Sequence, residues 1–220
     1  GANTVGGDIQ LINTAGTLTV TGISETGGGN VVVSNQGALT TTGAITTAAN
    51  GNITLTASGT ETLNAVVTAG GSGNVTLTAT GPASDILFNA TTSSVSGNIT
   101  ASAGKNVTLG AGDLSTTGNI TLNAAQSAAG TVTEATTGKI LNAALLTTNS
   151  NGGTTLNNAN TVNGFNATNT TSNDIQLTNT AATLTVTGIS ETGGGNVVVS
   201  NTGALTTTGA ITTAANGNIT

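Results

Sequence analysis

A Gly-Asn pair followed by a β-branched residue recurs along this chain at a nearly constant interval. The occurrences are Gly29-Asn30-Val31, Gly51-Asn52-Ile53, Gly73-Asn74-Val75, Gly97-Asn98-Ile99 and Gly118-Asn119-Ile120, with Gly7-Asp8-Ile9 and Gly138-Lys139-Ile140 as variants. Successive occurrences begin 22, 22, 22, 24, 21 and 20 residues apart. Periods of this length are typical of solenoids, in which stacked repeats bury a core that no single repeat can bury alone.

Apolar and polar residues alternate after each Gly-Asn pair, as in a half-buried strand. In the run from Ile53 to Ala57, we expect Ile53, Leu55 and Ala57 to point inward and the two threonines to face solvent. The same two inward positions recur in the other repeats as Val31 and Val33, Val75 and Leu77, Ile99 and Ala101, and Ile120 and Leu122. Stacked repeats would therefore form ladders of like aliphatic side chains.

Each repeat has room for two further strands. The second is marked by Leu18 and Val20, Leu39, Leu63, Val107 and Leu109, and Val132, and the third by Ile23, Ile45, Val67 and Leu114. Thr, Val and Ile favour strands, whereas Gly and Asn weaken helices. The sequence therefore predicts an all-β parallel β-helix, or β-solenoid, with three short strands per ~22-residue coil.

A much longer repeat contains these coils. Residues 8–54 recur as residues 174–220 with three changes, at Ile12, Gly16 and Gln36, and the offset is 166 residues without a gap. We therefore interpret 1–220 as one continuous solenoid segment, 8–173 as one tandem unit and 174–220 as the start of the next. About eight coils per unit predict an axial length of ~38 Å at ~4.8 Å per coil.

The regular spacing ends near Gly138, so 139–173 are expected to form two short or irregular coils. Neither end of the chain resembles a cap, because residues 8–54 and 174–220 are copies of one internal sequence. We therefore expect the chain to continue as further copies, joined covalently or end to end, and lateral bundling is a further option.

The corners of the coils are predicted from their Gly and Asn residues. Glycine, and to a lesser degree Asn, adopts positive φ, which a sharp corner often requires. Asn at one position in every coil also predicts an amide ladder that runs along the axis.

Charge and composition exclude several functions. The formal net charge is −6, and the only basic residues are Lys105 and Lys139, so the chain lacks the cations that neutralise phosphates in nucleic-acid binding. Binding to an anionic membrane surface is disfavoured for the same reason. No apolar run approaches the ~20 residues of a spanning helix. Without His or Cys, the usual general bases and soft metal ligands are absent, so we expect no catalysis and no cofactor.

One pair of carboxylates is a candidate site. Glu61 and Asp85 each lie 13 residues before the Asn of the next coil, so stacking would place them in adjacent layers ~5 Å apart. Like charges at that distance repel unless a cation or a proton intervenes. A weak Ca²⁺ site is one interpretation, although it needs several more oxygen ligands. Two solvated surface acids that splay apart are the other.

Regular threonines raise a second class of function. Thr-x-Thr pairs occur at Thr19 and Thr21, Thr40 and Thr42, Thr54 and Thr56, and Thr76 and Thr78, and such arrays are similar to the ice-binding faces of some antifreeze solenoids. The alternative is that Thr simply suits the outer face of a parallel sheet. A polysaccharide-binding platform lacks Trp and Tyr, and a polysaccharide-cleaving β-helix lacks clustered acidic and basic residues.

The Gly51-to-Ala57 type of coil, and residues 158–167 leading into Asp174-Ile175-Gln176-Leu177, resemble the repeat regions of filamentous-haemagglutinin-like bacterial exoproteins. The resemblance covers essentially the whole chain. It implies a right-handed parallel β-helix shaft outside the cell, within a very large surface or secreted adhesin that is commonly exported by two-partner secretion. The function expected on this basis is a non-catalytic structural shaft.

Overall fold

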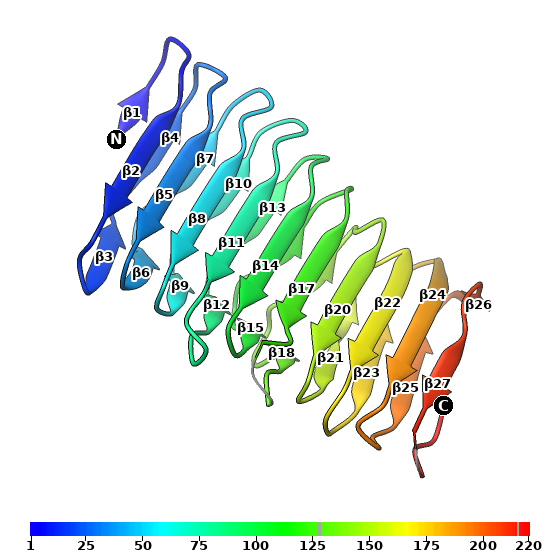
Figure 1. The fold of residues 1–220 in the computed structure, drawn as a ribbon. Coiled ribbons are helices and arrows are strands. Elements are labelled where there is room, and N and C mark those ends of the chain that lie inside the picture. Colours follow the sequence, from blue (N-terminus) through cyan, green and yellow to red (C-terminus); the bar gives the residue numbers. More distant parts are fainter. Residues whose placement is uncertain (127–128, 215) are drawn as a thin grey trace.

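The chain forms a parallel β-solenoid of about ten coils in a computed structural model that describes residues 1–126, 129–214 and 216–220 (Figure 1). Its strands lie in three sheets, and every strand pair between neighbouring coils is parallel. No helix is found in the described residues. The predicted all-β parallel β-helix with three strands per coil is therefore confirmed.

The three sheets are called A, B and C here. Sheet A contains β1 (Ala2–Asn3), β4 (Ile23–Glu25), β7 (Ile45–Thr47), β10 (Val67–Ala69), β13 (Thr92–Ser94), β16 (Leu114–Ser115) and β19 (Ile140–Leu141). Sheet B contains β2 (Ile9–Asn13), β5 (Val31–Asn35), β8 (Ile53–Ala57), β11 (Val75–Ala79), β14 (Ile99–Ala103), β17 (Ile120–Ala124), β20 (Leu146–Ser150), β22 (Gly164–Asn169), β24 (Thr183–Glu191), β26 (Ala204–Thr207) and β27 (Ile211–Thr213). Sheet C contains β3 (Thr17–Val20), β6 (Ala38–Thr41), β9 (Glu61–Leu63), β12 (Ile86–Phe88), β15 (Val107–Leu109), β18 (Val132–Glu134), β21 (Thr154–Asn160), β23 (Ile175–Asn179) and β25 (Val197–Asn201).

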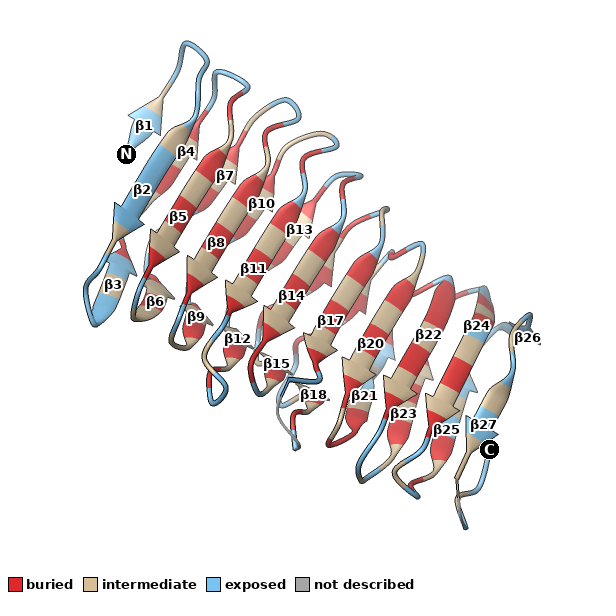
Figure 2. Cartoon of the chain, in the orientation of Figure 1, coloured by how far each residue is buried: buried red, intermediate tan, exposed pale blue. Residues whose placement is uncertain are grey.

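The core is a column of stacked aliphatic side chains between the sheets. In sheet B, Val31, Ile53 and Val75 are paired in register, and all three are fully buried. The intervening residues of each strand are partly exposed, which gives the alternating bands along the strands in Figure 2. The inward and outward positions predicted from the period-two pattern are therefore confirmed.

The corner glycines are required for a different reason from the one predicted. Gly29, Gly51 and Gly73 do not have positive φ angles, whereas Gly7 at the first corner does (94°). A Cβ on Gly51 would lie 2.1 Å from the carbonyl oxygen of Gly29 in the coil below, and one on Gly73 would lie 2.1 Å from that of Gly51. Glycine recurs there because successive corners stack too closely for any side chain.

Residues 139–173 form the irregular part of the solenoid, as expected. β21 is seven residues long, and its register against β23 shifts between Leu156 and Asn160. Sheet A continues beyond β19 only as an isolated bridge between Leu141 and Thr161. The chain therefore passes from sheet C to sheet B through just three residues, 161–163.

This short connection places the two copies of the long repeat in different sheets. β2 and β5 lie in sheet B, whereas their copies β23 and β25 lie in sheet C. The copies of β3 and β4 are joined in one strand of sheet B, β24. Because β23 follows β3 by seven layers in sheet C, the 166-residue unit spans seven coils and about one third, rather than eight. At ~4.8 Å per coil, its axial length is ~35 Å.

Candidate functional site

The two carboxylates proposed as a pair lie in different environments. Glu61 is the first residue of β9 and pairs with Ile86, so its neighbour in the next coil is aliphatic. Asp85 precedes Ile86 and lies at the corner, half-buried. The predicted stacking of Glu61 on Asp85 is therefore wrong, and so is the solvated position of Glu61, which is fully buried.

The error comes from unequal turn lengths. The connection from β13 to β14 is one residue shorter than the one from β10 to β11, so Ile86, and not Asp85, occupies the position of Glu61. The extra residues of this coil lie in the connection 80–85, which contains the exposed Pro82. The alternation of Glu61 with Leu63 was the signal that could have placed Glu61 inside, because residues two apart in a strand share a face.

Glu61 is an isolated carboxyl group inside an aliphatic column. It lies between Leu39 and Ile86, and neither of its oxygens has a hydrogen-bond partner. Burial raises the pKa of this carboxyl from 4.5 to about 8, while the nearby backbone of Thr78 and Ala57 lowers it by less. The neutral form therefore predominates at pH 7.

A second acid, Glu134, is less isolated. It pairs with Leu109 at the end of β18, and its Oε2 accepts a hydrogen bond of 2.6 Å from the backbone N–H of Asn158. Its Oε1 is buried without a partner. Burial, together with the charge of Asp113, raises the pKa of Glu134 to about 7, against the opposing effect of the hydrogen bond from Asn158 and of the nearby polar groups of Asn160 and Asn157.

Glu25 and its copy Glu191 are buried acids that close a turn. The carboxylate of Glu25 accepts hydrogen bonds from the backbone N–H groups of Gly27 (2.7 Å) and Gly28 (3.0 Å). Glu191 accepts one from Gly193 (2.7 Å) and one from the side-chain amide of Asn169 (3.2 Å). Both acids therefore hold the Gly-rich corner against the strand before it.

Asp85 has a structural role at the corner before sheet C. Its Oδ1 accepts a hydrogen bond of 3.0 Å from the backbone N–H of Asn106, one coil later. The Oδ1 of Asn106 in turn accepts from the backbone N–H (3.1 Å) and hydroxyl (3.0 Å) of Thr131. The backbone N–H of Asp85 itself donates to the hydroxyl of Thr60 in the coil below (3.2 Å), so Asp85 is one member of a side-chain ladder along this corner. The described residues contain no group of three His, Cys, Asp or Glu side chains that could hold a metal ion.

The main ladder is the predicted column of asparagines at the corner before sheet B. The Oδ1 of Asn52 accepts from the backbone N–H (2.8 Å) and side-chain amide (3.3 Å) of Asn74, and the Nδ2 of Asn52 donates to Asn30 at 2.9 Å. Asp8 begins this column and Asp174 begins its copy. An aspartate suits the first position of the column because its carboxylate only has to accept hydrogen bonds from the next coil. The predicted amide ladder is confirmed.

Replacing one member of the ladder should weaken the solenoid measurably. Asn52→Ala removes the acceptor of the Asn74 backbone N–H and the donor to Asn30, so we expect the free energy of unfolding in urea to fall by about 1–2 kcal/mol. Thr54→Ala, on the outer face two residues away, is the matched control and should change it by less than about 0.5 kcal/mol. Equal losses in the two variants would show that the ladder contributes nothing specific.

The Thr-x-Thr pairs do not form one array. Thr19 stacks on Thr40 in sheet C, whereas Thr54 stacks on Thr76 in sheet B, so the four predicted pairs are divided between two faces. On sheet B one column remains threonine over five coils, at Thr54, Thr76, Thr100, Thr121 and Thr147. The neighbouring column changes to Ser102, Asn123 and Asn149, whose side chains hydrogen-bond to one another.

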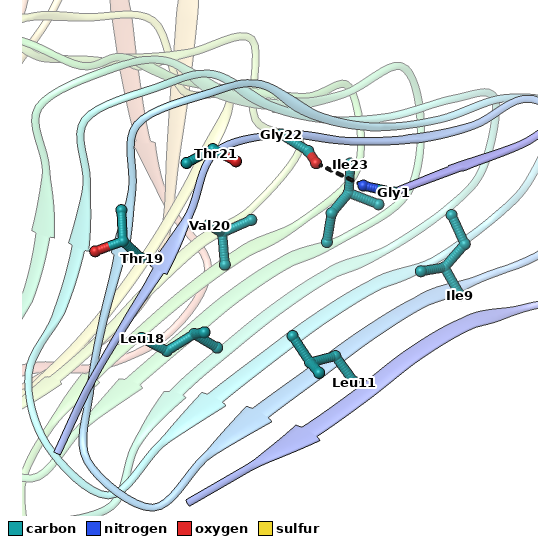
Figure 3. Close-up of a pocket in the computed structure, with 9 residues that line it drawn as sticks. All are labelled: Gly1, Ile9, Leu11, Leu18, Thr19, Val20, Thr21, Gly22 and Ile23. Atoms are coloured by element: carbon teal, nitrogen blue, oxygen red, sulfur yellow. Dashed lines mark hydrogen bonds between the residues drawn. The ribbon is translucent and has the colours of Figure 1, made fainter. Parts of the chain in front are cut away.

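An apolar hollow lies at the open end of the first coil. It has a volume of about 280 Å³ and is lined mainly by Ile9, Leu11, Leu18, Val20 and Ile23 (Figure 3). The N-terminal amine donates to the carbonyl of Gly22 at its rim (3.1 Å). The copies of these five residues, Ile175, Leu177, Leu184, Val186 and Ile189, are all buried under the preceding coil. In the second copy, the residues equivalent to this lining are therefore the ones that a preceding coil covers.

The chain matches no protein-family model, no curated protein and no solved structure. Among its described residues, none belong to a helix long and apolar enough to cross a bilayer.

Proposed function

We propose that this chain is a segment of the structural shaft of a giant, repetitive extracellular fibre or cell-surface adhesin, and that it has no catalytic role. The observation that carries the proposal is that one 47-residue sequence occurs twice in the chain, and that its second copy stacks directly on the coil before it. In the second copy, Ile175 and Leu177 pair with Thr154 and Leu156 of the coil below. In the first copy, the equivalent residues Ile9 and Leu11 line an apolar end surface.

The contacts between coils suit a mechanical role. Neighbouring coils are joined by parallel backbone ladders, by the aliphatic columns and by the corner ladders, all of which extend along the axis. Stability in such an array is close to a sum of nearest-neighbour terms, so length increases without a new fold. The resemblance to filamentous-haemagglutinin-like exoproteins supports a location outside the cell.

The partners in this proposal are further copies of the same repeat, joined covalently or end to end. An apolar end surface and a row of unpaired backbone groups are what a further coil would cover. Lateral bundling of shafts is a second form of association, beside the end-to-end contact through the apolar end surface. Neither nucleic acid nor a cofactor is part of it.

The mass of the 220-residue chain in solution tests this proposal. We expect concentration-dependent, end-to-end association in light scattering. Leu11→Lys places a charge in the apolar end surface, where Leu11 is 39% exposed, and should reduce the association at least tenfold. Gln10→Lys, an outward residue of the same strand, is the matched control and should leave it unchanged. A wild-type chain that is a stable, folded monomer at all concentrations would refute end-to-end joining.

A further inference from the structure

The two copies of the repeat present the same surface on different sides of the solenoid. Ser34 lies on the outer face of sheet B, where it is paired with Ile12 and Thr56. Its copy Ser200 lies on the outer face of sheet C, where it is paired with Thr178. The strands that carry them, β5 and β25, belong to separate sheets in Figure 1.

The local packing of the two copies is nevertheless the same. Ile9 pairs with Val31 in the first copy, and Ile175 pairs with Val197 in the second. The corner hydrogen bond from the backbone N–H of Asn30 to Asp8 is 2.8 Å long, and its counterpart from Asn196 to Asp174 is also 2.8 Å. The change of side therefore arises from the coils between the copies and not from the copied sequence.

The cause lies in residues 139–173. Because the 166 residues of a unit contain seven coils and about one third, the next unit starts one sheet further along the circuit of the chain, which runs from B to C to A. β2 and its copy show the step from B to C, and the β4 sequence moves from A into β24 of sheet B. These two strands move by one sheet in the same direction, whereas the β3 sequence moves from C to the first part of β24 in sheet B, where it pairs with Gly164 and Phe165.

We infer that consecutive units of an array present equivalent surfaces on successive sides of the shaft, turned by about one third of a revolution per unit. This inference rests on the proposed function, since it concerns an array. Equivalent surfaces return to one side after three units, or ~105 Å along the axis at ~4.8 Å per coil. Binding sites for a partner that recognises one unit, including a neighbouring shaft, are then distributed around the whole circumference instead of along one edge.

The full 220-residue chain tests the inference because it contains both copies. It has no Cys, so Ser34→Cys and Ser200→Cys can be biotinylated together and marked with monovalent streptavidin for electron microscopy. We expect the two markers on different sides of the rod, about one third of a revolution apart. Two markers on the same side would overturn the inference.

A disulfide test shows directly whether β23 lies beside β21 in sheet C or beside β22 in sheet B. Thr155 pairs with Gln176 across sheet C, so Thr155→Cys with Gln176→Cys should oxidise within one chain. Asn166→Cys with Gln176→Cys places one thiol on sheet B and should not oxidise. The reverse result would overturn the inference. Both tests are made within single chains, so a chain that stays monomeric would contradict the proposed function without affecting them.

Discussion

Ile53→Asp is expected to lower the free energy of unfolding by about 5 kcal/mol. Ile53 is fully buried and lies in register between Val31 and Val75 in the main aliphatic column. Aspartate loses the apolar contacts of the isoleucine, leaves a gap in the column and buries a carboxyl group without a partner. Urea denaturation measures the loss, and limited proteolysis should show cleavage concentrated near this coil.

The control for this substitution is its neighbour in the same strand. Thr54 is half-buried on the outer face, so Thr54→Asp adds a charge that water can solvate, and we expect a change within about 0.5 kcal/mol. The two substitutions are expected to differ about tenfold in their effect on the free energy of unfolding, because the side chain of Ile53 points inward and that of Thr54 points outward. If the two variants resist urea and protease alike, the assignment of the two faces is wrong.

Glu61→Leu is expected to stabilise the solenoid, and by more at pH 8 than at pH 5. The pKa of Glu61 rises from 4.5 in the unfolded chain to about 8 in the folded chain. For an acid with a raised folded-state pKa, its contribution to stability is fully present below pH 4.5 and is lost as the pH rises through about 8. The wild type should therefore lose roughly 5 kcal/mol from this group across that range, at about 1.4 kcal/mol per pKa unit.

The pH dependence separates this prediction from simple repacking. Leucine restores the aliphatic column between Leu39 and Ile86, and Glu61→Leu should abolish most of the fall in stability between pH 5 and pH 8. Glu61→Gln should flatten the same profile without the gain from apolar packing, because its amide remains buried and unpaired. Glu134, whose pKa is raised to about 7, leaves a smaller slope in both variants. A wild-type stability that is constant from pH 5 to pH 8 would contradict the buried, unpartnered state of Glu61.

Much of the fold was predictable because one physical pattern repeats in every coil. The alternation at Ile53, Leu55 and Ala57 determines which side chains are buried, and the Gly-Asn step determines where each coil closes. The ladder of asparagines could be predicted because Asn occupies the same corner of successive coils, and these corners stack along the axis. These are local features, so counting residues was sufficient to find them.

The predictions that were wrong depended on register between coils of unequal length. A turn shorter by one residue moved Ile86 into the position expected for Asp85, and a change of one residue reverses inside and outside in a strand. The Thr-x-Thr array failed because Thr40 and Thr54 belong to different sheets of the coil. The fractional number of coils per unit depends on the irregular residues 139–173, where no period could be counted.

The length of tandem arrays tests the central claim most directly. Genes that encode two, three and four copies of residues 8–173, followed by 174–220, should yield unbranched rods in electron microscopy. Each added unit should lengthen the rod by ~35 Å, because seven coils and a third rise ~4.8 Å each. Compact particles joined like beads, or a length that does not increase in constant steps, would contradict a continuous structural shaft.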